Sequence, residues 1–426
     1  MRILLIAYGF PPLASPQAIR WYYLTRELVK LGVDVHVLAP DLPSAGRSAL
    51  ELPAGVVVHR CHAGGFAAWV AQLKRPRAAA SAPSSSASVP AKRGLNWKGR
   101  LYQKLDALIG LWTYSDNRGQ WRKFALGEAR RVIEAIQPDA IVSSHEPPVS
   151  LEVGLQCGRG RVWLADLGDP VLAPYTPKRW HRRAWALEES VCDSAAAVSV
   201  TTEATRKLLI ERHGAAPDKI LVLPQGYDDA LPIEFSAAPP INRQQPLQLL
   251  YTGRFYAFRD PTALLEAVLE QDDVQLTIVA PEISADHLAL IERSQGRIVF
   301  LGEQPHARAL ALQQACDVLV NIGNALDAQT PGKLFEYLGS GKPVLHCYSV
   351  EDDPANALIA QTGRGWSCRN RSADLRAFLQ VLTESPERCY GELSNDVARI
   401  AAYGWSRLAQ RWLDRCRLEV TRARAG

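Results

Sequence analysis

The sequence contains no long apolar segment. Its 426 residues include no apolar run that approaches the roughly 18 residues needed to span a membrane as a helix. The stretch from Met1 to Tyr8 is too short for the apolar core of a signal peptide, and no small-residue cleavage site follows it. We therefore expect neither a membrane span nor a secretion signal, and these first residues are predicted to form a buried strand.

Cysteine pairs and a dinucleotide fingerprint are also missing. The eight cysteines are scattered without any CxxC spacing, which disfavours a structural zinc site and indicates reduced thiols in a cytoplasmic protein. No GxGxxG motif follows the first predicted strand, and its absence argues against a dinucleotide-dependent dehydrogenase. Nothing in the composition suggests a nucleic-acid partner, since the net charge is only +5.

One segment lacks acidic residues entirely. Between Lys74 and Lys104 there are eight basic residues and no Asp or Glu, and residues 78–90 are low-complexity Ala, Ser and Pro. This insertion near residues 75–95 is either a solvated loop or a surface that attracts an anionic membrane or a phosphorylated acceptor. The aromatic, basic stretch from Trp97 to Trp112 has helical spacing, and such a helix either packs on its own domain or lies on a membrane interface.

Short apolar runs alternate with helical patterns along the rest of the chain, which is typical of parallel α/β units. Strands are predicted at residues 2–8, 33–39, 56–61, 140–145, 161–167, 196–201 and 220–224, and then at 247–253, 274–280, 298–302, 316–321 and 342–347. The proline-rich residues 231–246 separate the two series. We predict an N-terminal domain at 1–230, a linker at 231–246 and a C-terminal domain at 247–426, whose last helix either caps its own domain or crosses back to the first.

Basic side chains follow the first strand of the predicted C-terminal domain. Gly253 permits close approach of the backbone to a ligand, and Arg254 and Arg259 are suited to phosphate because a guanidinium donates two parallel hydrogen bonds. Farther on, Thr330 is predicted as a helix N-cap with Pro331 at the first helical position. Lys333 and Glu336 then share one helical face, either as an anion and ribose site or as a plain surface pair.

Polar residues also end two strands of the predicted N-terminal domain. His145 ends one of these strands, and Asp166 and Asp169 lie at the end of the next. Ligands in open α/β sheets bind at the carboxyl ends of the strands, so these side chains are candidates for a site. Each of them is equally compatible with an ordinary cap or turn residue.

These elements together resemble the retaining GT-B glycosyltransferases of family four. The resemblance is carried by Phe10-Pro11-Pro12, the turn from Pro224 to Asp228, the run from Tyr251 to Arg254 and the run from Lys333 to Val344. It implies an α/β fold of two facing Rossmann-like domains with a nucleotide-sugar donor in the cleft between them. It implies that Arg254 binds the donor diphosphate with Arg259 or Lys333, that Glu336 holds the ribose, and that His145 lies near the donor sugar. Gly302 and Glu303 fall where the nucleotide base is contacted.

The sequence departs from this family at two points. Ala328 replaces the first Glu of the family's E-x7-E motif, with Asp327 beside it, and Ala14-Ser15 replaces the usual Gly-Gly. We expect a UDP- or GDP-sugar donor, a saccharide or lipid-linked acceptor, retention of configuration and no metal. Two alternatives are a sugar-nucleotide epimerase, which would use Asp166 and Asp169, and a non-catalytic subunit of the same fold.

Overall fold

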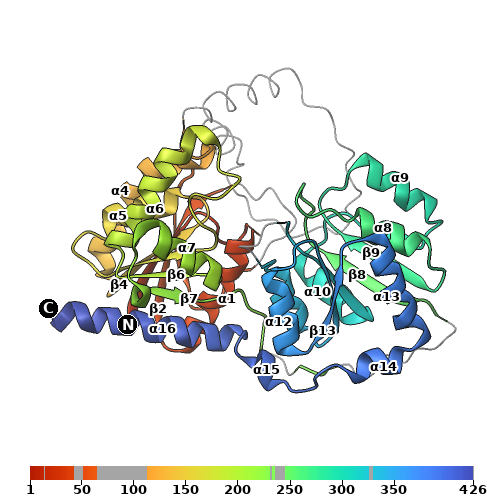
Figure 1. Cartoon of the computed structure of the whole chain (residues 1–426). Helices are drawn as coiled ribbons and strands as arrows, with labels where there is room; N and C mark the ends of the chain where they lie inside the picture. Colours follow the sequence, from red (N-terminus) through yellow and green to blue (C-terminus); the bar gives the residue numbers. More distant parts are fainter. Residues whose placement is uncertain are drawn as a thin grey trace, which may run out of the picture.

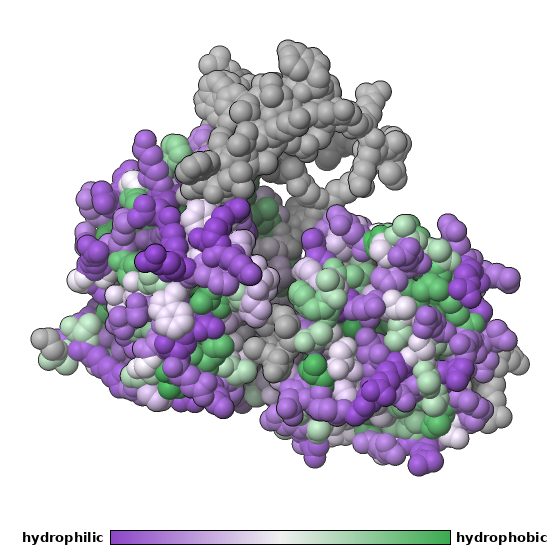
Figure 2. Space-filling model, turned by 45° about the horizontal axis from the view of Figure 1, so that its top comes forward, coloured by the Kyte–Doolittle hydropathy of each residue, from purple (hydrophilic) through white to green (hydrophobic). Residues whose placement is uncertain are grey.

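The fold consists of two lobes, each built on one parallel sheet (Figure 1). The structure is a computed structural model, and it describes residues 1–13, 15–42, 51–64, 113–230, 233–235, 245–325 and 330–425. The predicted basic insertion, the Trp97–Trp112 helix, Asp327 and Ala328 lie outside the described residues, as does most of the predicted linker. In space-filling view the surface is divided into two lobes that are largely hydrophilic outside (Figure 2).

The first sheet has seven strands in the order β3-β2-β1-β4-β5-β6-β7. They are β1 (Arg2–Ala7), β2 (Asp34–Asp41), β3 (Val57–His62), β4 (Ala140–His145), β5 (Trp163–Leu167), β6 (Ala197–Val200) and β7 (Ile220–Val222), and all their pairings are parallel. The strand order reverses between β1 and β4, so the carboxyl ends of these two strands border the crevice in which open sheets bind ligands.

Both faces of this sheet are covered, as the continuous apolar sequence of β1 requires. Leu4 and Ile6 pack toward α4 (Trp121–Ile136), α5 (Val149–Cys157) and α6 (His181–Ser194). Ile3 and Leu5 pack on the opposite face toward α1 (Pro16–Lys30). Alternate side chains of one strand therefore enter two separate cores. Among the described residues, this lobe also contains α7 (Glu203–His213) and the short 3-10 helices at Asn117–Gln120, Lys178–Trp180 and Pro217–Lys219.

The second sheet has six parallel strands in the order β10-β9-β8-β11-β12-β13. They are β8 (Leu247–Thr252), β9 (Val274–Val279), β10 (Ile298–Phe300), β11 (Val318–Ile322), β12 (Val344–Tyr348) and β13 (Gly365–Arg369). Its helices are α8 (Thr262–Leu269), α9 (Ala285–Arg293), α10 (His306–Ala315), α11 (Lys333–Gly339), α12 (Pro354–Thr362), α13 (Ser372–Glu384), α14 (Pro386–Gly391) and α15 (Ala398–Ala401). Here the strand order reverses between β8 and β11.

The C-terminal helix α16 (Trp405–Ala425) belongs to the core of the first lobe. Its apolar stripe of Trp405, Leu408, Trp412 and Cys416 is buried in the same cluster as α1. Trp412 packs edge-to-face on Trp21 at 5.8 Å, and Trp405 stacks on Tyr23 at 5.7 Å. Figure 1 shows α16 running beneath the first lobe, away from the second lobe.

Two chain crossings therefore connect the lobes, and they lie side by side. The Tyr227 amide donates to the Tyr403 carbonyl at 3.1 Å, and the Trp405 amide donates to the Tyr227 carbonyl at 3.0 Å. Gly226 has no room for a side chain, because a Cβ there would lie 2.6 Å from the Tyr403 carbonyl oxygen. Within the described residues, every helix is too short or too polar to cross a membrane.

Candidate functional site

The end of β8 carries the two predicted phosphate-binding arginines. Arg254 is exposed, and Arg259 is half-buried with its Nη1 donating to the Arg254 carbonyl at 3.3 Å. Asn324, which follows β11, accepts from Arg259 Nε at 3.1 Å and from Nη2 at 2.6 Å. The pair of loops at the strand-order reversal thus holds this guanidinium in place.

Neither of these arginines is neutralised. In the described part of the chain, no carboxylate forms an ion pair with Arg254 or Arg259. Arg259 is instead held by the neutral amide of Asn324 and lies 5.6 Å from the Tyr256 ring centroid. Two positive charges beside Gly253 therefore remain for an anionic ligand.

Lys333 and Glu336 form the second half of the predicted donor site. Glu336 Oε1 accepts from Lys333 Nζ at 2.6 Å and from Gln313 Nε2 at 2.5 Å. Gln313 Nε2 also lies 3.3 Å from Thr252 Oγ1, and Thr252 directly precedes Gly253. The hydroxyl of Tyr337 accepts from the Thr252 amide at 2.7 Å. These bonds connect the start of α11 to the end of β8, so the two halves of the predicted site meet there.

Glu336 is ionised at neutral pH. Burial would raise the pKa of its carboxyl, but Lys333, His306 and Gln313 together hold that pKa below its ordinary value. The side chain is 16% exposed and its Lys333 partner is 32% exposed. The predicted surface pair therefore does form, although the carboxylate is anchored by buried groups rather than free in solvent.

The prediction for the start of this helix was wrong. Helix α11 begins at Lys333, with Gly332 as its N-cap residue, and no side chain caps it. Thr330 lies two residues before that cap, and the Leu334 amide bonds to the Pro331 carbonyl at 3.0 Å. The tight turn at Pro331-Gly332 delays the helix by two residues. It also makes Lys333 the first helical residue, where its charge meets free backbone N–H groups.

Glu303 stands apart from the other predicted donor residues. It follows β10 in an exposed loop, after Gly302 with φ of 69°. Among the described residues, no hydrogen bond or ion pair joins it to Arg254, Lys333 or Glu336.

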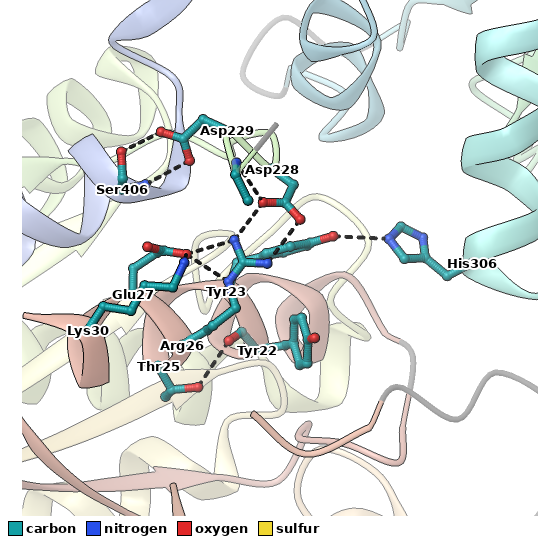
Figure 3. Close-up of polar contacts among 11 residues, drawn as sticks. Tyr22, Tyr23, Thr25, Arg26, Glu27, Lys30, Asp228, Asp229, His306 and Ser406 are labelled. Carbon is teal, nitrogen blue, oxygen red and sulfur yellow. Dashed lines mark hydrogen bonds and ion pairs between the residues drawn. The ribbon is translucent and has the colours of Figure 1, made fainter. Parts of the chain in front are cut away.

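A contact between the lobes lies next to Glu336. Figure 3 shows Tyr23 extending from α1 toward His306 at the start of α10, with the Tyr23 hydroxyl 3.4 Å from His306 Nε2. Arg26 lies 4.8 Å from the Tyr23 ring centroid and donates to both oxygens of Asp228, at 2.9 and 2.6 Å. His306 also helps to lower the pKa of Glu336. A single residue, His306, therefore connects Tyr23 of the first lobe to the predicted ribose site.

His145 lies in the first lobe at the end of β4 and is 2% exposed. Burial lowers the pKa of its imidazole to about 4, so the ring is neutral at pH 7. Its Nδ1 lies 3.0 Å from the Asp169 carbonyl, and a carbonyl only accepts, so Nδ1 carries the proton. Nε2 then has a free lone pair with which to accept a hydrogen bond.

Two carboxyl groups surround this histidine. Asp169 Oδ2 accepts from the Tyr175 hydroxyl at 3.0 Å, and Tyr175 also bonds to Glu146. Burial raises the pKa of Glu146, and burial together with the Glu146 charge raises the pKa of Asp169. This cluster lies at the carboxyl ends of β4 and β5.

Asp166 has a structural role. Its Oδ2 accepts from Arg20 Nε and Trp21 Nε1, each at 3.0 Å, and its Oδ1 accepts from Arg20 Nη2 at 3.0 Å and Ser199 Oγ at 2.6 Å. Both oxygens are thus occupied inside the core, and the side chain is 1% exposed. The expectation that Asp166 could act on a bound sugar is not supported by this geometry.

Two cavities lie in the described part of the chain near the site or in the first lobe, and neither contains the whole predicted site. A cavity of about 430 Å³ lies beside Tyr256 and Arg259 and extends to Ser284 and His287. A larger one of about 630 Å³ lies in the first lobe, among α4, α5 and α6. Among the described residues, no group of three or more His, Cys, Asp or Glu is arranged to hold a metal ion. All eight cysteines are free thiols.

Sequence reasoning missed the partners that position these groups. Asn324, Gln313 and His306 belong to three different loops or helices, and only the fold brings them to Arg259 and Glu336. The one usable signal was position, because Asn324 follows a buried strand directly and the ends of adjacent parallel strands meet at one edge.

Comparison with known proteins agrees with this architecture. Residues 17–226 match the glycosyl transferase 4-like domain family. Sequence comparison with curated proteins gives no match. The solved structure of sucrose-phosphate synthase from Thermosynechococcus elongatus is similar with a TM-score of 0.66 at 16% identity, and the alignment covers 98% of each chain.

Two other similar structures are HepE from Anabaena in complex with UDP and the lipopolysaccharide outer core galactosyltransferase WaaB. HepE has a TM-score of 0.63 at 14% identity, covering 97% of this chain and 99% of its own. WaaB has a TM-score of 0.55 at 13% identity, covering 98% of this chain and 100% of its own. Residues 17–226 therefore form a glycosyl transferase 4-like domain, and the whole chain has the two-domain GT-B fold.

Proposed function

We propose that this protein transfers a hexose-type sugar from a nucleoside diphosphate to a saccharide or lipid-linked acceptor, with retention of anomeric configuration. The observation that carries this proposal is the pair of guanidiniums beside Gly253. Arg254 and Arg259 have no carboxylate partner in the described chain, although Arg259 is firmly held by Asn324. A preorganised, uncompensated pair of charges of this kind is suited to a diphosphate.

The donor diphosphate binds at Arg254 and Arg259 in this proposal, with Lys333 contributing from the start of α11. As the bond between the anomeric carbon and the diphosphate breaks, negative charge develops on the departing phosphate oxygen. Cations already fixed in position stabilise that charge without reorganising, which is the main way such sites accelerate a reaction. The acceptor hydroxyl bonds to the anomeric carbon on the same face, and its proton leaves with the phosphate oxygen.

The ribose hydroxyls bind to Glu336. This carboxylate is ionised, and its Oε1 is already occupied by Lys333 and Gln313. An ionised carboxylate has about four acceptor positions, so Oε2 is available for two hydroxyl groups. Thr330 and Glu303 remain proposed contacts of the donor phosphate and the base. The UDP bound in HepE supports UDP as the nucleotide, and GDP is the alternative.

The donor sugar faces the first lobe. His145 is neutral there and accepts a hydrogen bond from a sugar hydroxyl at Nε2, because its Nδ1 donates to Asp169. Glu146 and Asp169 lie beside it and provide acceptors for further hydroxyl groups. An epimerase would need a carboxylate free to take a proton from the sugar. Asp166 does not meet that need, since Arg20, Trp21 and Ser199 occupy both of its oxygens.

The cellular location and the biosynthetic role are also proposals. We place the enzyme in the cytoplasm, in biosynthesis of cell-surface polysaccharide or another glycoconjugate. The peripheral contact with an anionic membrane rests on the basic residues between Lys74 and Lys104 and on the aromatic stretch from Trp97 to Trp112, which lie outside the described structure.

Release of UDP or GDP from a panel of nucleotide sugars, by the full chain with and without acceptor saccharides, tests this function. A non-catalytic subunit would release neither. Arg254→Ala should lower turnover by orders of magnitude and leave the thermal midpoint unchanged, because the charge acts chiefly in the transition state. Arg293→Ala on α9 removes an exposed arginine away from the site and should change neither quantity. Turnover by Arg254→Ala close to that of Arg293→Ala would contradict the proposed diphosphate site.

A further inference from the structure

The larger cavity has the composition of a second anion site. Its volume is about 630 Å³, and it lies between the N-terminal half of α4 and the first turns of α5 and α6. Four of its lining residues are basic, namely Arg122, Lys123, Arg130 and Arg183, and the acidic lining residue is Glu152. Figure 2 shows strongly hydrophilic side chains gathered on the upper part of this lobe.

Glu152 neutralises only part of this charge. It accepts from Arg183 Nη2 at 2.7 Å, and its other oxygen lies 3.5 Å from Arg122 Nε. Lys123 and Arg130 are exposed on α4, and neither forms an ion pair with a carboxylate of the described residues. The lining therefore has a formal charge of +3, which favours a ligand with two or more negative charges over a single carboxylate.

The cavity wall also carries hydrogen-bonding atoms without a partner. Tyr114 is 3% exposed, and its hydroxyl makes no hydrogen bond within the described structure. Gln120 Nε2 is a buried amide donor that also makes no hydrogen bond within the described structure. The Arg183 guanidinium lies 4.5 Å from the Tyr114 ring centroid, which fixes it over an aromatic face. Both unpartnered atoms have almost no accessible surface, so a ligand in the cavity would contact the basic side chains instead.

We propose that this cavity binds a phosphate or diphosphate group, and that the ligand is a phosphorylated acceptor saccharide. The preference for phosphate follows from the four cations that line the cavity, and the identification of the ligand as an acceptor rests on the proposed function. Its size fits a ligand larger than inorganic phosphate, since small-molecule sites span about 300–1,000 Å³. It is separate from the proposed donor site, because none of the proposed donor-binding residues lines it.

Lysine acylation read by peptide mass mapping tests the phosphate site directly. Saturating inorganic pyrophosphate should slow acylation of Lys123 at least fivefold and leave Lys207, an exposed lysine on α7, unchanged. Arg130→Ala should raise the half-protecting pyrophosphate concentration by about tenfold, the scale of one charged hydrogen bond. Arg159→Ala, an exposed arginine elsewhere in the same lobe, should leave that concentration unchanged. Equal protection of both lysines, or no effect of Arg130→Ala, overturns the proposal.

Two further measurements distinguish this site from the proposed donor site and from a membrane-binding surface. In an Arg254→Ala chain the protection of Lys123 should persist, so failure of the proposed donor site and failure of this cavity are distinguishable. Vesicles of phosphatidylglycerol, compared with phosphatidylcholine, test a membrane surface. Protection of Lys123 by the anionic vesicles but not by pyrophosphate would overturn the cavity as an acceptor site and assign these cations to membrane contact.

Discussion

The buried Arg20–Asp166 pair should be essential for stability and dispensable for chemistry. Its two side chains are 0% and 1% exposed, and they are joined by two hydrogen bonds of 3.0 Å. Replacing Asp166 by Asn removes the charge partner of Arg20 and places an amide N–H group against a donor, whichever way the amide is turned. Removing one partner of a buried ion pair costs about 3–5 kcal/mol, because the other charge stays buried and uncompensated.

Urea unfolding followed by far-UV circular dichroism measures this cost. The control is Asp34→Asn, which breaks a surface pair with Arg2 whose side chains are 43% and 45% exposed. That change should cost less than about 1 kcal/mol. Arg20→Met should be much less harmful in the Asp166→Asn background than alone, because the uncompensated charge is then gone. Donor turnover per folded molecule should stay within a few-fold of the parent. Unchanged stability with turnover reduced by orders of magnitude would refute the structural role and revive the epimerase alternative.

Two further predictions concern Glu336 and His145. Glu336→Gln should weaken nucleotide binding by about 1–3 kcal/mol in calorimetric titrations, whereas exposed Glu292→Gln should have no effect. Unchanged affinity would mean that Glu336 only pairs with Lys333. For His145, burial lowers the pKa to about 4, so its contribution to stability is complete above pH 6.5 and is lost as the pH falls toward 4. The free energy of unfolding of the parent, minus that of His145→Asn, should therefore fall by about 3 kcal/mol between pH 7 and pH 4. A difference that does not vary with pH would contradict the lowered pKa.

The sheets were predictable because parallel buried strands have an unmistakable sequence. All twelve predicted strands are confirmed, since runs such as residues 2–7 are apolar at nearly every position. The strand at Ala140–His145 has the predicted bounds, and the other eleven differ slightly at their ends. The thirteenth strand, β13, was missed. Its sequence begins with Gly365 and ends with Arg369. Because β13 lies at the edge of the sheet, it pairs with one strand only and is less apolar than the central strands. Of the four edge strands β3, β7, β10 and β13, hydrophobic pattern therefore missed only β13, whose ends are Gly and Arg.

The site was predictable only where local sequence carries the chemistry. Arg254, Arg259, Lys333 and Glu336 could be named from two short motifs. The fold then brings α11 to the end of β8, where Tyr337 and Gln313 contact Thr252. Tyr23 and His306 could not be paired, because 283 residues separate them and neither has an unusual sequence context. The N-cap prediction at Thr330 was wrong because the turn at Pro331-Gly332, and not the capping preference of Thr330, determines where α11 begins.

The partners of each cation distinguish structural from ligand-binding roles across this molecule. Arg20 and Arg212 are each paired with a carboxylate that is essentially unexposed, Asp166 and Glu188, so their charges are used within the fold. Arg254, Arg259, Lys123 and Arg130 have no such partner in the described chain, although each lies beside a cavity or a strand end. An unpaired cation is ordinary on a protein surface, but one that lies beside a cavity or a strand end is available to an anionic ligand.

Lys333 lies between these two classes. It pairs with Glu336, yet both side chains remain partly exposed, at 32% and 16%. A diphosphate that drew Lys333 toward itself would leave Glu336 anchored by Gln313 and with more of its acceptor capacity free for the ribose. In this proposal Lys333 binds the diphosphate and Glu336 binds the ribose of the same nucleotide. The two residues are suited to this because they occupy one turn of the same helix.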